Sequence, residues 1–67
     1  MTVLLNNDHF TLEGEHRSVR EILAAKGWSF PLIVVKVNGV LIPRPSWDSA
    51  KVCDGDEMDA MHLVSGG

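Results

Sequence analysis

Alternation of apolar and polar residues predicts two strands at the start of the chain, over residues 2–6 and 9–13. The residues between them, Asn6, Asn7 and Asp8, tolerate the left-handed backbone of a tight hairpin turn. The side chains that alternation places on one shared face are Val3, Leu5, Phe10 and Leu12. We expect this face to form part of the core.

A helix is predicted over residues 18–27, where the start and stop signals agree. Ser18 can accept a hydrogen bond from the first turn while Glu21, three residues later, reaches back to it in a capping box. Gly27 supplies the left-handed residue with which helices commonly end. Residues expected to pack into the core from the helix and the segment behind it are Val19, Ile22, Leu23, the methylene stem of Lys26, Trp28 and Phe30.

The second half of the chain is expected to return to strands. β-Branched residues dominate residues 32–38, and the Asn-Gly pair at 38–39 is the strongest hairpin signal in the sequence. Residues 40–44 form the returning strand, which Pro43 restricts to a sheet edge because proline has no amide hydrogen to donate.

A connection follows over residues 45–53, with one helical turn expected around residues 47–50. Asp-Gly-Asp at 54–56 predicts a turn, and residues 57–64 are predicted to form the last strand. Runs of strands around a single helix indicate an α+β fold. We therefore expect a mixed sheet of about five strands with the helix packed on one face.

The face of the sheet that points away from the helix carries apolar residues where polar ones are expected. A contiguous apolar patch on a small protein commonly marks a binding surface. Alternation places there Leu4, Val34, Met61 and Leu63, beside the charged Lys36 and Asp59. We therefore predict that these four apolar residues form a partner-docking surface.

Composition bounds the classes of function. The 67 residues are 45% hydrophobic and 22% charged, which suits one small folded domain. A formal net charge of -3 disfavours nucleic acid as a partner, since that binding needs clustered Lys and Arg. No apolar stretch has the length of a membrane span or the form of a secretory signal. Because Cys53 is the only cysteine, an internal disulfide is excluded and a cytoplasmic location is expected.

Candidate catalytic and metal-binding residues do not combine into a recognisable site. His9, His16, His62 and Cys53 lack the spacing of a zinc site. Acidic neighbours at 54–57 oppose ionisation of the Cys53 thiol, so we expect a small packed residue there rather than a nucleophile. The same acidic cluster lacks the later Glu of an EF-hand loop, and turn formation explains it better than calcium binding. We expect no bound cofactor or metal and no catalysis by the fold itself.

The chain end is the remaining candidate for chemistry. Gly66 and Gly67 carry no side chain, so together with Ser65 they form a slim segment that can enter a narrow channel. The terminal carboxylate is ionised at neutral pH and can attack the α-phosphate of ATP in a partner's site. The reactive group would then be the chain end.

Three stretches of the sequence resemble the ThiS family of small sulfur carrier proteins. They are VKVNGVLIPRPSW at 35–47, DGDEM at 54–58 and the final Gly-Gly. The family typically carries a V-x-V-N-G-x-x-x-P-R-x-x-W block, a D-G-D turn and a Gly-Gly end, and it has its single helix where residues 18–27 predict one. The resemblance covers the whole chain. The sequence departs from the family at Ser65, where a third glycine is often seen, in the second proline of PRPSW and in the bulkier KGWSFP segment.

The resemblance implies a β-grasp, ubiquitin-like domain over residues 1–64 and a flexible Ser-Gly-Gly tail over residues 65–67. It implies that a ThiF-like enzyme uses ATP to adenylate the Gly67 carboxylate. A sulfur donor enzyme would then supply sulfur that originates in cysteine, giving a thiocarboxylate (1-thioglycine) at Gly67. In the thiamine route a ThiG-like thiazole synthase receives this sulfur. The chain would be a carrier and substrate rather than an enzyme, docking through the face near Met61 and Leu63.

Other functions are compatible with the same fold. Related carriers serve molybdopterin synthesis or other thiocarboxylate pathways, and a ubiquitin-like modifier would join Gly67 to a lysine of another protein. A β-grasp interaction module would leave the glycines inert, but it would give no role to the tail or to the block at 35–47.

Overall fold

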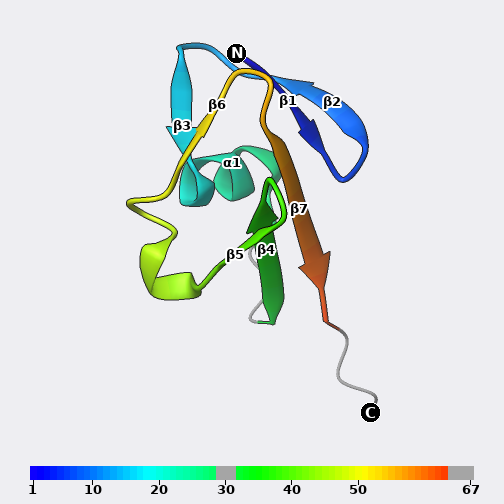
Figure 1. Cartoon of the computed structure of the whole chain (residues 1–67), viewed down its shortest axis with the longest axis vertical. Helices are drawn as coiled ribbons and strands as arrows, with labels where there is room; N and C mark the ends of the chain where they lie inside the picture. Colours follow the sequence, from blue (N-terminus) through cyan, green and yellow to red (C-terminus); the bar gives the residue numbers. More distant parts are fainter. Residues whose placement is uncertain (29–31, 64–67) are drawn as a thin grey trace.

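The computed structural model of the chain describes residues 1–28 and 32–63. The elements follow in the order β1 (Thr2–Leu5), β2 (Asp8–Thr11), β3 (His16–Ser18), α1 (Val19–Lys26), β4 (Ile33–Val37), β5 (Val40–Ile42), the 3-10 helix η1 (Arg44–Ser46), β6 (Lys51–Cys53) and β7 (Glu57–His62) (Figure 1). Phe30, which the sequence predicted to close the core, lies outside the described residues, as do Val64 and the predicted tail at 65–67.

The main sheet has five strands in the order β2-β1-β7-β4-β5. β1 and β7 run parallel, whereas the other neighbouring pairs are antiparallel, so the sheet is mixed. α1 packs on one face, and β7 runs through the centre of the sheet away from the end where Met1 lies (Figure 1). This is the β-grasp arrangement that the family resemblance implied.

The two hairpins of the sheet turn through left-handed residues, as their asparagines predicted. Asn6 and Asn7 have φ angles of 50° and 68° between β1 and β2. Asn38 and Gly39 have φ angles of 51° and 82° between β4 and β5. Such turns match the twist of the strands they join, so these two pairs fix the register of both hairpins.

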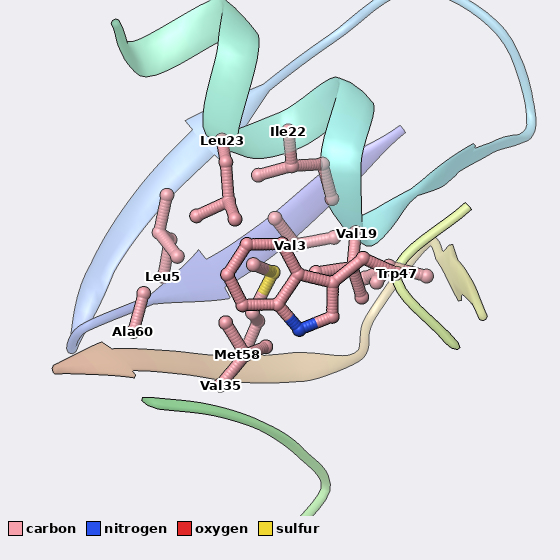
Figure 2. Packing of buried hydrophobic residues seen from close by; sticks show 10 residues of the cluster. Val3, Leu5, Val19, Ile22, Leu23, Val35, Trp47, Met58 and Ala60 are labelled. Atoms are coloured by element: carbon pink, nitrogen blue, oxygen red, sulfur yellow. The ribbon is translucent and has the colours of Figure 1, made fainter. Parts of the chain in front are cut away.

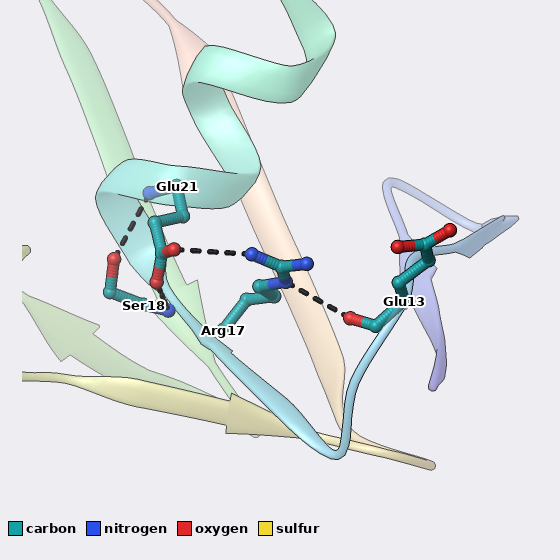
Figure 3. Close-up of polar contacts among 4 residues, drawn as sticks. All are labelled: Glu13, Arg17, Ser18 and Glu21. Atoms are coloured by element: carbon teal, nitrogen blue, oxygen red, sulfur yellow. Dashed lines mark hydrogen bonds and ion pairs between the residues drawn. The ribbon is translucent and has the colours of Figure 1, made fainter.

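The predicted capping box starts α1 (Figure 3). The Ser18 hydroxyl accepts from the Glu21 N–H at 3.1 Å, and the Ser18 N–H donates to the Glu21 carboxylate at 2.9 Å. The hydrogen bonds from the backbone N–H and the side chain of Ser18, followed by the contact with Arg17, lower the pKa of Glu21. Gly27 ends the helix at a φ angle of 72°. No helix in residues 1–28 or 32–63 is long and apolar enough to cross a membrane.

The core lies between α1 and the inner face of the sheet, the face toward the helix (Figure 2). Its buried residues are Val3, Leu5, Val19, Ile22, Leu23, Val35, Trp47, Val52, Met58 and Ala60. Phe10, Leu12 and Trp28 are partly buried against this cluster, as predicted. Lys26 is exposed, and its ammonium lies 4.9 Å from the Phe10 ring centroid and 5.3 Å from that of Trp28. It therefore covers the edge of the core by cation-π contacts.

The connection after β5 differs from the prediction. The helical segment begins earlier than the turn expected at 47–50: the 3-10 helix lies at Arg44–Ser46, and in the turn that follows the Ala50 N–H donates to the Ser46 carbonyl at 2.8 Å. Pro43 and Pro45 explain the shift, since each proline ring fixes φ near the helical value and Pro45 falls in the first turn. Trp47 follows this helix directly and points into the core. The edge position expected from Pro43 is confirmed, although β5 itself ends one residue before it.

The sequence did not predict β3 and β6, which form a second sheet of two antiparallel strands. Each has three residues, and Arg17 pairs with Val52 at its centre. Cys53 is exposed on β6, so the expectation that it packs inside the fold is wrong. Because neighbouring residues of a strand point to opposite faces, burial of Val52 turns Cys53 outward.

Candidate functional site

The segment predicted to carry the chemistry follows β7, the central strand of the sheet. Ser65, Gly66 and Gly67 lie outside the described residues, so the structure shows the support of this segment and not the segment itself. β7 pairs with β1 on one side and with β4 on the other. One residue beyond β7, the Leu63 N–H donates to the Leu32 carbonyl at 2.8 Å. The chain is thus held to the sheet up to Leu63.

The predicted docking residues lie on the outer face of the sheet, the face away from α1, but they do not all gather. Val34 and Met61 are direct cross-strand partners, and Leu63 follows Met61 on the same face. Leu4 is apart from them, because its neighbour on β7 is Glu57. At about 3.3 Å per residue, Glu57 lies roughly 13 Å along the strand from Met61. Leu4 is also half-buried, whereas Met61 and Leu63 are exposed.

Two exposed residues of the same outer face were missed. Leu32 adjoins Leu63 at the start of β4, and Leu41 of β5 pairs with Lys36. Both side chains are more than half exposed. Alternation carried through residues 32 and 41 would have found them, since each is in phase with Val34 and Lys36. We define the outer-face patch as Leu32, Val34, Leu41, Met61 and Leu63.

A shallow hollow of about 410 Å³ adjoins this patch. It is lined by Asn6, Asn7, Val34, Lys36, Asp59, Ala60 and Met61. Lys36 and Asp59 face each other across β4 and β7, one step along the sheet from Val34 and Met61. The apolar patch is therefore bordered by one positive and one negative side chain, the mixture typical of a protein interface with a polar rim.

Asn38, in the V-N-G stretch that resembles ThiS, holds strand ends together. Its side-chain oxygen accepts from the Glu57 N–H at 2.9 Å, and its amide group donates to the Asp56 carboxylate at 3.2 Å. Its backbone N–H donates to the Glu57 carbonyl at 2.7 Å. Asn38 therefore joins the β4-β5 turn to the start of β7 and has a structural role.

The acidic residues of the D-G-D turn accept backbone hydrogen bonds. The Asp54 carboxylate accepts from the Thr2 N–H and the Asp56 carboxylate from the Cys53 N–H, each at 2.8 Å. These bonds fit the prediction that turn formation explains the cluster. In the described ranges 1–28 and 32–63, no three His, Cys, Asp or Glu residues lie together as a metal site requires.

The candidate zinc ligands are dispersed over the fold. Cys53 pairs with His16 across β6 and β3, whereas His9 lies on β2 and His62 at the end of β7. Since β2 is an edge strand and the β3-β6 pair is a separate sheet, these four residues do not form one site.

Trp47, the last residue of the block at 35–47, belongs to the core and not to the outer face. Its indole N–H donates to the Ile42 carbonyl at 3.0 Å. The guanidinium groups of Arg44 and Arg20 lie 4.6 Å and 5.6 Å from its ring centroid. Arg20 also contacts Asp48 at 2.6 Å. These contacts fix the connection between β5 and β6 against α1.

A comparison with protein families assigns the chain to one of them. The ThiS family model matches residues 3–67, which include the whole described domain after Thr2 and the final glycines. The chain belongs to the ThiS family. No curated protein matches the chain.

Solved structures agree with the ThiS assignment. The crystal structure of a thiamine biosynthesis protein (ThiS) from Geobacter metallireducens is 29% identical, with all of both chains covered and a TM-score of 0.86. An NMR solution structure of a thiamine biosynthesis protein from the same organism is also 29% identical. It covers all of this chain and 88% of its own, with a TM-score of 0.80. The ThiS resemblance drawn from the motifs is confirmed.

Proposed function

We propose that this ThiS-family chain is a sulfur carrier of thiamine biosynthesis that works through the carboxylate of Gly67. The observation that carries the proposal is the family match, which runs without interruption from the β-grasp domain to Gly67. The two similar structures from Geobacter metallireducens are of a thiamine biosynthesis protein, which favours that pathway over molybdopterin synthesis or protein modification.

The chemistry proceeds in two displacements. A carboxylate oxygen of Gly67 attacks the α-phosphate of ATP in a ThiF-like enzyme, forming an acyl adenylate and releasing pyrophosphate. Hydrosulfide (HS⁻) supplied by a donor enzyme then attacks the activated carbonyl carbon, displaces AMP and loses its proton, which leaves a thiocarboxylate on Gly67. A ThiG-like thiazole synthase receives this sulfur. The carrier supplies the acyl group, and its partners supply the catalytic groups.

The glycines suit this role because of what they lack. Without a Cβ atom, Gly66 and Gly67 let an extended chain pass through a channel too narrow for other residues. An enzyme that must enclose ATP and the reacting carboxylate benefits from such a channel, since excluding water protects the adenylate from hydrolysis.

Intact-mass measurement tests the proposal. The chain is incubated with ATP, a ThiF-like enzyme and a cysteine-dependent sulfur donor, and we expect the mass gain of one oxygen-to-sulfur exchange at Gly67. Chains that lack Gly67, or that carry one further residue after it, should fold normally and show no gain. Adenylation of either altered chain, or lysine adducts in place of the thiocarboxylate, would contradict the carrier function.

We further propose that the outer-face patch docks the ThiF-like enzyme. Met61→Asp places a charge in the patch, and we expect a KM for adenylation at least about tenfold higher, since a buried unpaired charge costs several kcal/mol. Val40→Asp is the matched control, because Val40 is 62% exposed against 63% for Met61 and, by its pairing with Val37, points to the inner face of the sheet. Equal KM values for the two variants would refute docking through the patch.

A further inference from the structure

Asn6 makes contacts that its position in a hairpin turn does not explain. The turn needs left-handed residues at positions 6 and 7, and Asn, Asp or Gly satisfies that need. The Asn6 side chain also reaches Ala60 on β7, 54 residues away in sequence. Its amide group donates to the Ala60 carbonyl at 3.0 Å, and its oxygen accepts from the Ala60 N–H at 2.8 Å.

These two hydrogen bonds stand where one further residue of β1 would have paired with β7. β1 ends at Leu5, and the last backbone bond from its side joins the Asn6 N–H to the Met58 carbonyl at 3.0 Å. β7 continues to His62, so the backbone groups of Ala60 lie beyond the reach of the β1 backbone. A carboxamide has one donating and one accepting side, as a peptide group does, and it fills this position in the ladder.

Ala60, which Asn6 contacts, is nearly buried, so loss of the two hydrogen bonds is expected to destabilise this end of β7. Ala60 is only 8% exposed, and backbone groups that are buried without partners destabilise a structure about as much as a lost hydrogen bond. Asp at position 6 would lack the donor, and Gly would lack both groups. Asn7 has the same left-handed backbone, yet within residues 1–28 and 32–63 its side chain forms no hydrogen bond. The neighbouring turn residue thus provides a natural comparison.

We propose that Asn6 is a positioning residue for the reaction at Gly67, because it holds the β1-facing side of β7 near the end from which the C-terminal segment leaves the sheet. The inference rests on the proposed function. With β7 held to Leu63, four residues remain up to Gly67, a reach of about 13–14 Å. When the end of β7 also opens from β4 as far as Ala60, seven residues lie beyond that point and the extended reach becomes about 23–25 Å.

Loss of the Asn6 contact weakens binding and leaves the chemical step unchanged. Residues 60–63 are then held only through β4, so this end of β7 opens more often. In the opened molecules a longer segment must be ordered before the carboxylate reaches ATP. The probability of chain closure falls with the three-halves power of segment length, so closure over seven residues is about twofold less probable than closure over four. The effect should appear in KM and not in kcat.

Asn6→Gly and Asn7→Gly test the inference, because both keep the turn conformation and only the first removes the contact. In Asn6→Gly we expect the Ala60 amide to exchange with solvent at least about tenfold faster than in the unaltered chain. We also expect its KM for adenylation by a ThiF-like enzyme to rise by up to about twofold at constant kcat. Asn7→Gly should match the unaltered chain in both measurements. Equal Ala60 exchange or equal KM in the two variants overturns the inference.

A second variant covers the case in which Asn6→Gly does not fold. Asn6→Asp keeps the turn and the acceptor but loses the donor, so it should shift both measurements in the same direction. If the unaltered chain is adenylated and the Asn6 variants have the same KM, the role of Asn6 is overturned. The proposed function then stands. If the unaltered chain is not adenylated, the proposed function and the role of Asn6 in the reaction at Gly67 are both overturned. The exchange rate of the Ala60 amide still decides whether Asn6 holds β7.

Discussion

Trp47 gives the sharpest test of the division between structural and functional residues. Its side chain is 4% exposed and lies in the core cluster with Val19 and Met58 (Figure 2). Truncating a buried Trp to Ala destabilises proteins by about 3–5 kcal/mol. A chain of 67 residues has a total stability of about 3–10 kcal/mol. We therefore expect Trp47→Ala to be largely or wholly unfolded at 25 °C.

Trp47→Phe separates the hydrogen bond from the packing. It removes the indole N–H that donates to the Ile42 carbonyl, worth about 0.5–1.5 kcal/mol, and leaves a small void in place of the larger ring. We expect a loss of about 1–3 kcal/mol, which at about 4–8 °C per kcal/mol lowers the melting temperature but keeps the domain folded at 25 °C.

Urea unfolding followed by far-ultraviolet circular dichroism measures both losses, and the adenylation assay on folded Trp47→Phe completes the test. Since Trp47 is in the core and the docking patch is on the outer face, the KM of this variant should equal that of the unaltered chain. The reasoning fails if Trp47→Ala costs less than about 1 kcal/mol, or if folded Trp47→Phe is adenylated poorly.

Three further predictions concern stability. Asn38→Ala should lose about 1–3 kcal/mol of unfolding free energy in urea, because it forces Ala into a left-handed turn and leaves the Glu57 N–H without its acceptor. Asn38→Gly should lose less, since glycine adopts the turn conformation without strain. Equal losses in the two variants would contradict the turn argument. Because the pKa of Glu21 is lowered in the fold, its ionised carboxylate stabilises the fold above the unfolded carboxyl pKa of about 4.3. This stabilisation is lost as pH falls through the folded pKa. The unfolding free energy of Glu21→Gln should therefore depend less on pH in this acid range. Ile22→Ala should lose about 2–5 kcal/mol and exposed Val40→Ala less than about 0.5 kcal/mol in the same assay.

Local chemistry predicted the parts of the fold that short segments determine. The asparagine turns follow from left-handed backbone preference, and α1 follows from the Ser18 and Glu21 capping box, so neither depends on distant contacts. β3 and β6 were missed because each has three residues, too few to show a period, and because His16 pairs with Cys53 far along the chain. The Asn6 contact with Ala60 is equally long-range, and its local sequence indicates only a turn.

The candidate site was predicted in part for the same reason. Alternation within strands placed Val34 and Met61 on one face, and the structure shows that they are partners. Alternation does not give the offset between strands, so Leu4 was grouped with residues that lie well along the sheet from it. The chemistry assigned to Gly67 came from the chain end and from family resemblance, since no fold contact specifies a reactive carboxylate.

The central place of β7 has a consequence for incomplete chains. The first six strands leave two separate hairpins in the main sheet, β1-β2 and β4-β5, and β7 alone joins them. Isolated two-stranded ribbons are marginal in water, so a chain cut before residue 57 should have no sheet around which a core can form. We expect such fragments to be degraded as unfolded polypeptide. A fragment without the proposed reactive end would then not accumulate as a folded competitor for the proposed activating enzyme.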